Sequence, residues 1–155
     1  MVDYNSIFLD KTGQSNMATP DWDSDRITAF LDARAYIVSR EYATPWADFE
    51  SVPDQYQYPV VIYSAIEYWW LKAGEYLTKF DINVSGGGAT GQKSSQLFYR
   101  ALEMIDYLKK ELEIVGKTMM DSTGTGDILV GTLIKRSKFT GYLVPRSDDP
   151  KGDWT

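Results

Sequence analysis

The stretch PVVIYSAIEYWWLKAGEYLTKF, Pro59–Phe80, decides the fold of this chain. A proline at the first position suits the first turn of a helix, because the N–H that proline lacks has no partner there in any case. With residues placed at steps of about 100°, the polar side chains gather in one sector and the rest of the circumference is apolar or aromatic. The polar positions are Ser64, Glu67, Lys72, Glu75, Thr78 and Lys79. We therefore predict a long helix with an unusually wide apolar surface.

Two interpretations of this wide surface can hold together. The helix can be the central core helix of a small domain, covered by its neighbours in the chain. Part of its surface can also meet another subunit, since aromatic side chains are enriched at protein interfaces. We name Trp69, Trp70 and Tyr76 as the predicted subunit contacts.

A second helix is predicted upstream of this stretch. It begins in PDWDSD, where Asp23 or Ser24 can cap the free backbone N–H groups. Its apolar positions recur at helical spacing: Ile27, Leu31, Ala35, Val38 and Tyr42.

A third helix is predicted downstream, from about residue 94 to 115. Its apolar face comprises Leu97, Ala101, Met104, Ile105, Leu108, Leu112 and Val115, and its polar face comprises Arg100, Glu103, Asp106, Lys110 and Glu113. Gly116 suits the C′ position that ends a helix. The predicted fold class is thus mainly α, a small bundle of three principal helices over residues 21–116.

The two ends of the chain lack a helical period. Residues 1–20 are expected to form an irregular N-terminal arm. Residues 117–155 are expected to form a flexible or extended C-terminal arm, with a β-hairpin over the β-branched stretch 128–145. Between residues 131 and 147 there are four basic residues and no acidic ones, namely Lys135, Arg136, Lys138 and Arg146. They belong either to a solvated hairpin or to an arm that docks onto an acidic protein surface, such as that of another copy.

Composition limits the function. A chain of 155 residues is a domain of ordinary size, and its net charge of −6 argues against a surface that binds nucleic acid throughout. The absence of cysteine and histidine excludes disulfides, thiolate chemistry and an ordinary zinc site. No signal peptide is recognisable, and the longest apolar run, 59–71, is too short to cross a bilayer. We expect a soluble protein without a membrane partner.

Two stretches come close to ligand-binding motifs. In SGGGATGQKSS, Gly86 and Gly91 have the separation of a phosphate-binding loop, but Gln92 takes the lysine position and Lys93 comes one residue late. In DWDSDRITAFLD, aspartates match positions of a calcium loop, but Arg26 stands where a glycine is required. No spacing singles out a catalytic pair either. We expect no catalytic, cofactor or metal site, and a nucleotide-binding enzyme is a remote third interpretation.

From Asp21 to Glu113, the order of elements resembles the head–tail connector (adaptor or neck) proteins of tailed bacteriophages. The closest part is KFDINVSGGGATGQKSSQLFYRALEMIDYLKKELE, in which this family has a short extended piece and a Gly/Ser loop before its last helix. The resemblance implies a non-enzymatic, dodecameric ring of identical subunits at the head–tail junction of the virion, present in the host cytoplasm during assembly. Its partners would be the portal protein and the next tail, neck or stopper protein, and DNA would pass through the channel without specific binding. The alternative is a small soluble helical module that binds and regulates another protein.

Overall fold

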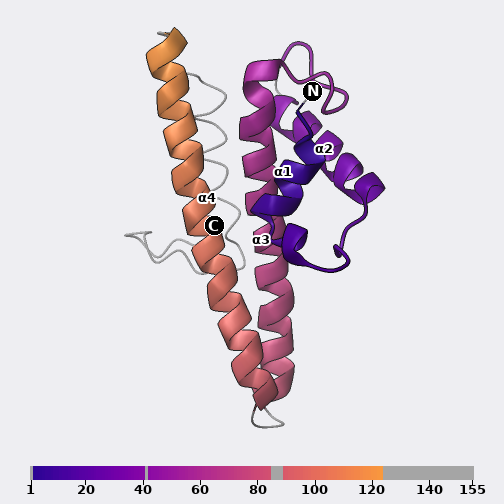
Figure 1. Ribbon diagram of the computed structural model, residues 1–155, viewed down its shortest axis with the longest axis vertical. Coiled ribbons are helices and arrows are strands. Elements are labelled where there is room, and N and C mark those ends of the chain that lie inside the picture. The colour runs from indigo at the N-terminus through magenta and orange to yellow at the C-terminus, as the bar shows by residue number, and fades with distance from the viewer. Residues whose placement is uncertain (1, 41, 85–88, 124–155) are drawn as a thin grey trace.

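The computed structural model describes residues 2–40, 42–84 and 89–123. Helices account for most of this part and no β-strand occurs in it, which confirms the mainly α fold class. The elements are α1 (Tyr4–Lys11), the 3-10 turn η1 (Gln14–Asn16), α2 (Ser24–Ser39), α3 (Asp54–Val84) and α4 (Ala89–Thr123). The helices α3 and α4 form a long antiparallel hairpin, and α1 and α2 pack against the half of it that includes the start of α3 (Figure 1).

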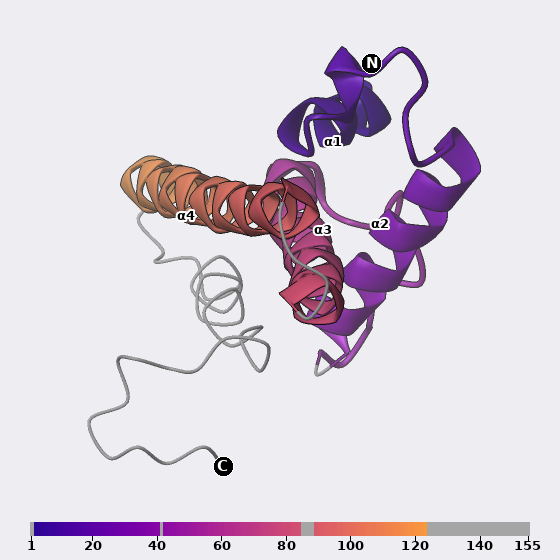
Figure 2. The same ribbon diagram turned by 90° about the horizontal axis from the view of Figure 1, so that it is seen from below.

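The central helix is α3, as the sequence predicted. All seven residues from Val60 to Ile66 are buried, so nearly two full turns of the helix are covered on every side. The hydroxyl of Ser64 within this run donates to the carbonyl of Val60 at 2.7 Å, which satisfies the polar atom inside the core. The covering elements are α1, α2 and α4, which lie on three sides of α3 when the hairpin is seen end-on (Figure 2).

The predicted upstream helix is confirmed as α2. Its N-cap is Asp23, whose carboxylate accepts the backbone N–H of Arg26 at 2.8 Å. The buried side chains include four of the five predicted apolar positions, Ile27, Leu31, Ala35 and Val38. The fifth prediction is wrong, because α2 ends at Ser39 and Tyr42 lies beyond it with 40% of its surface exposed.

The prediction of an irregular arm over residues 1–20 is wrong for its first half. Asp3 caps α1 by accepting the backbone N–H of Ser6, and Phe8 in this helix is completely buried. The ring of Phe8 stacks on Trp22 at 5.8 Å between centroids and meets Tyr68 edge-on at 6.0 Å. A helix of two turns is too short to show a clear hydrophobic period. Phe8 is the one residue of α1 that is fully buried, and Tyr4, Ile7 and Leu9 are partly buried against the same core.

The ends of the hairpin helices also differ from the prediction. The helix α3 begins at Asp54, so Pro59 lies inside it and not at its start, and α3 continues to Val84. The extended piece that the phage resemblance implied is therefore helical over residues 81–84. In the same way, α4 continues through Gly116 to Thr123, and Gly116 is not a C′ residue. Glycine costs about 1 kcal/mol inside a helix, and at this buried position packing outweighs that preference.

Candidate functional site

The three aromatic residues predicted to make subunit contacts lie in different environments. The indole N–H of Trp69 donates to the carbonyl of Lys11 in α1 at 3.0 Å, and the side chain is half-buried. Trp70 is only 8% exposed, and the ammonium of Lys109 in α4 lies 5.6 Å from its ring centroid. Tyr76 on α3 is half-buried and packs against the hydrophobic core.

These positions change the interpretation of the wide apolar surface of α3. Its aromatic residues in the first half of the helix are covered by α1 and by α4 of the same chain. The assignment of Trp69, Trp70 and Tyr76 to a subunit interface stays a prediction. Because Trp70 is buried, it leaves little surface for a neighbour to contact.

A polar group of three side chains links α1, α3 and α4. Both carboxylate oxygens of Glu111 accept from the ammonium of Lys11, at 2.8 and 3.0 Å, and the phenol of Tyr58 donates to the same carboxylate at 2.5 Å. Burial alone would lower the pKa of Lys11, but the hydrogen bond and the charge of Glu111 outweigh it and raise that pKa above 10.5. Burial and the neighbouring carboxylate also raise the pKa of Tyr58. Each group is satisfied by the others, so the cluster holds the helices together and offers no unpaired reactive atom.

A second polar group lies between α2 and α3. Burial raises the pKa of the Glu67 carboxyl, although the nearby Arg34 and a hydrogen bond from Tyr63 act in the opposite direction. One carboxylate oxygen of Glu67, Nε of Arg34 and the indole nitrogen of Trp70 are buried without a hydrogen-bond partner. The two charged groups are attracted to each other but do not form a close ion pair.

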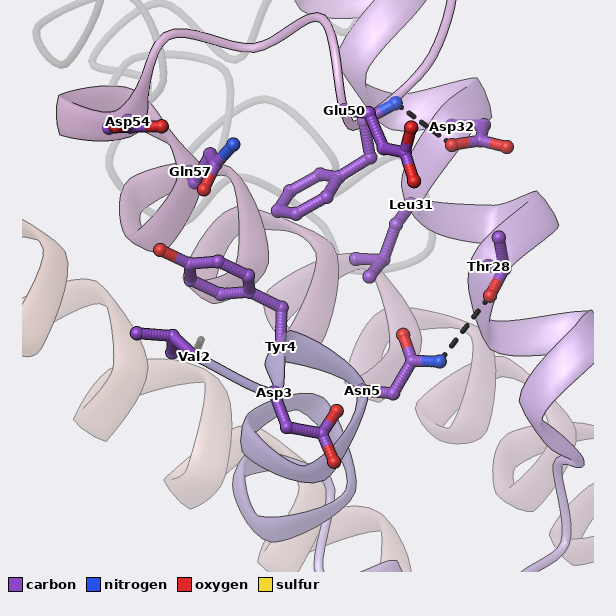
Figure 3. A pocket seen from close by; sticks show the side chains of 11 residues that line it. Val2, Asp3, Tyr4, Asn5, Thr28, Leu31, Asp32, Glu50, Asp54 and Gln57 are labelled. Carbon is purple, nitrogen blue, oxygen red and sulfur yellow. Dashed lines mark hydrogen bonds between the residues drawn. The ribbon is translucent and has the colours of Figure 1, made fainter.

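A cavity of about 740 Å³ opens where α1, α2 and the start of α3 meet (Figure 3). Its lining includes four carboxylates and no basic side chain: Asp3, Asp32, Glu50 and Asp54. Two of these carboxylates already have structural roles. Asp3 caps α1, and Asp32 accepts the backbone N–H of Phe49 at 2.8 Å.

The four carboxylates give the cavity a negative charge, which would attract a cation only weakly. Among the residues that the structure describes, no three histidines, cysteines or acidic residues come close enough together to hold a metal ion. The cavity shares no residue with the contacts predicted from the sequence.

The outer face of α4 carries large apolar side chains that the sequence analysis did not single out. Tyr99 is 62% exposed, Tyr107 is 58% exposed and Ile114 is 65% exposed. They lie among the charged residues that were assigned to the polar face of this helix. The sequence did contain a sign of this exposed apolar surface. Two tyrosines and an isoleucine lie on a helix face that would be entirely polar if only water covered it.

The near-motifs have ordinary structural roles. Gly91, Gln92 and Lys93 lie within the helical backbone of α4, and the glycines at 86–88 lie outside the described residues. Of the aspartates in the calcium-like stretch, Asp23 caps α2 and Asp21 lies 3.8 Å from the ammonium of Lys72.

The predicted docking residues Lys135, Arg136, Lys138 and Arg146 and the predicted hairpin over 128–145 lie outside the described residues. Their roles stay predictions.

No protein-family model, curated protein or solved structure matches this chain. None of the helices in the described ranges combines the length and the apolar character needed to cross a membrane.

Proposed function

We propose that this chain is a structural subunit of a virion, which forms a ring between the portal and the next neck or tail protein of a tailed phage. The proposal rests on the resemblance over Asp21–Glu113 and on one structural feature, the half of the α3–α4 hairpin that projects beyond α1 and α2 (Figure 1).

This projecting half begins near Lys72, whose ammonium lies 3.8 Å from the carboxylate of Asp21 in the segment just before α2. Beyond that point α3 and α4 have only each other as helical neighbours in the described part of the chain. A pair of helices covers one side of each partner and leaves the rest exposed. Large apolar groups are accordingly accessible there: Leu71 is 49% exposed and Tyr99 is 62% exposed. A neighbouring copy would cover them.

The arrangement of the helices also suits a ring. A closed cyclic assembly needs two different faces on each subunit, so that one face of a copy meets the other face of the next. Here α2 and α4 lie on opposite sides of α3, and both present an exposed outer face (Figure 2). The net charge of −6 is compatible with a channel wall along which DNA slides, because a basic wall would retain phosphates.

In this ring Trp69 and Tyr76 would contribute to subunit packing, and Trp70 less so because it is buried. The four basic residues Lys135, Arg136, Lys138 and Arg146 would dock on the portal or on a neighbouring copy.

The test is to mix the full chain with the portal ring encoded by the same genome and to measure the mass of the complex by light scattering. Negative-stain electron microscopy then shows its shape. We expect a second ring stacked on the portal, and we expect Tyr76→Ser to reduce its occupancy while leaving the helical circular dichroism unchanged. A chain that stays free in the presence of the portal, at concentrations well above those of assembly, would contradict the proposal.

The alternative function, a small helical module that binds another protein, is favoured by one observation. The aromatic surface of α3 that suggested a multimer is largely covered by the chain itself, as the 8% exposure of Trp70 shows. Indifference to the portal in the experiment above, with a compact folded chain, is the outcome that this alternative predicts.

A further inference from the structure

The outer face of α4 lies opposite the face that packs on α3. The packed face comprises Ala101, Ile105, Leu108 and Leu112, all of them buried. About half a turn away lies a stripe in which every residue is exposed, and we call it the outer stripe. It comprises Gln96, Tyr99, Glu103, Tyr107, Lys110, Ile114 and Lys117. These positions are three or four residues apart, so they form one continuous row along the helix.

Within the outer stripe, residues of complementary character stand at equal distances on either side of a midpoint. About the midpoint between residues 106 and 107, Glu103 is placed as far to one side as Lys110 is to the other. Tyr99 has Ile114 as its counterpart at the same distance. Just beside the stripe, Arg100 has an acidic counterpart in the same way, Glu113. These three pairs therefore match acid with base or apolar with apolar, whereas Gln96 has Lys117 as its counterpart and Tyr107 lies next to the midpoint.

Such a pattern is self-complementary when two copies of the helix run antiparallel. A two-fold axis through the midpoint places each residue of one copy opposite its counterpart in the other. Glu103 of each copy then faces Lys110 of the second copy, and Tyr99 faces Ile114. If the two copies paired in parallel, Glu103 of one copy would face Glu103 of the other, and Lys110 would face Lys110. Repulsion between like charges disfavours this arrangement.

We propose that the outer stripe of α4 is a homodimer interface, in which two copies of this chain pair antiparallel about a two-fold axis. The partner is a second copy because the charge pattern complements itself. The proposed ring would use the same outer face of α4 for one of its two subunit contacts, so a copy paired in this dimer cannot present that face to a ring neighbour. The dimer is therefore the form that we assign to the chain outside the ring, and its test needs the chain alone.

The size of the stripe sets the expected strength. From Gln96 to Lys117 a helix extends about 30 Å, at about 1.5 Å per residue. Contact along one such helix face lies at the small end of specific interfaces. Lys110 also has a partner in its own helix, Asp106 at 2.9 Å, and both groups are mostly exposed. Exposed ion pairs contribute little each. We therefore expect a dimer that dissociates on dilution in the micromolar range.

The experiment is sedimentation of the full chain over a concentration series, with a charge swap as the decisive step. Glu103→Lys places two lysines opposite each other on both sides of the two-fold axis, and Lys110→Glu places two glutamates there. Each variant alone should dimerise at least about tenfold more weakly than the parent chain, which corresponds to 1.4 kcal/mol. An equimolar mixture of the two variants should dimerise again, because every lysine then faces a glutamate.

A matched control is Ala29→Lys, which adds a charge to an exposed position of α2 and should leave the dimer unchanged. Circular dichroism of each variant shows whether the helices are retained. Three results would overturn the proposal: a parent chain that stays monomeric throughout the series, variants that dimerise as well as the parent, or a mixture that does not recover.

Discussion

The ammonium nitrogen of Lys11 lies 2.8 Å from Oε1 of Glu111, a residue one hundred positions further along the chain. This ion pair joins α1 to the middle of α4, and both side chains are less than one fifth exposed. The same carboxylate also accepts from Tyr58 in α3. The first helix is therefore fixed to the two longest helices by a polar contact as well as by the burial of Phe8.

We predict that Lys11→Met and Glu111→Gln each lower the free energy of unfolding by about 1 to 2 kcal/mol, because each leaves a half-buried partner without its counter-charge. A double-mutant cycle, with urea unfolding of the parent, the two single variants and the double variant, should give a coupling energy of about 1 kcal/mol. The exposed pair Lys110 and Asp106 provides the control, with a coupling of about 0.5 kcal/mol or less. Equal coupling energies in the two cycles would contradict a structural role for the α1–α4 contact.

The same ion pair predicts a dependence on pH. The pKa of Lys11 is raised above 10.5 in the folded chain, so folding favours the charged ammonium. The stabilisation is fully present below the unfolded pKa and is lost as pH rises through the folded one. The stability difference between the parent chain and Lys11→Met should therefore be constant from about pH 8 to 10 and should shrink above 10.5. A difference that already shrinks near neutral pH would exclude this group as its origin.

A third prediction concerns Phe8, the one fully buried residue of α1. Phe8→Ala should lower the free energy of unfolding by about 3 to 5 kcal/mol, because it leaves a cavity between Trp22 and Tyr68 that neither ring can fill. Val2→Ala, at a site that is 57% exposed, is the control and should change stability by about 0.5 kcal/mol or less. Urea unfolding measures both. A small effect at Phe8 would mean that residues 1–20 behave as the arm that the sequence suggested.

The sequence was informative where side chains repeat at helical spacing over several turns. α2 was predictable from four apolar residues spaced three or four positions apart and from a capping aspartate, and α3 was predictable from its long apolar stretch. α1 was not, because two turns give too few positions for a period and because its place depends on contacts with residues far away in the chain, such as Glu111.

The same reasoning explains what the sequence revealed of the candidate site. Trp69 and Trp70 were recognised as part of the wide apolar surface of α3. Their partners, Lys11 and Lys109, lie on other helices, so only the structure identifies them. The outer stripe of α4 was visible in the sequence as tyrosines within a polar face. Its exposure depends on which side of α4 faces α3, and only the three-dimensional structure shows this.

A further prediction concerns Gly13, which connects α1 to η1. Its φ is +72°, a left-handed conformation that residues with a Cβ adopt at a cost. A Cβ at this position would lie 3.8 Å from the ring of Trp69, an ordinary contact distance, so the cost comes from the backbone alone. Gly13→Ala should lower the unfolding free energy by about 1 kcal/mol, and Gly13→Asn by less, because asparagine tolerates this conformation better. Equal losses for the two substitutions would point to a steric origin instead.

The last prediction uses Glu67, whose carboxyl has a pKa raised by burial even though Arg34 is nearby. An acid with a raised pKa binds its proton more tightly in the folded chain than in the unfolded one. The parent chain therefore loses stability as pH rises from below the unfolded value of about 4.5 through the folded pKa. Glutamine at this position does not titrate, so Glu67→Gln should gain stability relative to the parent over that interval and keep the gain at pH 7.

Urea unfolding of the parent and of Glu67→Gln at several pH values measures the difference directly, because the titrations of all other groups largely cancel. Ala29→Gln is the control, because this exposed position on α2 carries no titratable group in either chain and the difference from the parent should not change with pH. If glutamine at position 67 instead becomes relatively less stable as pH rises, the attraction between Glu67 and Arg34 outweighs the burial of the carboxylate. The pair would then stabilise the contact between α2 and α3 at neutral pH, contrary to the raised pKa.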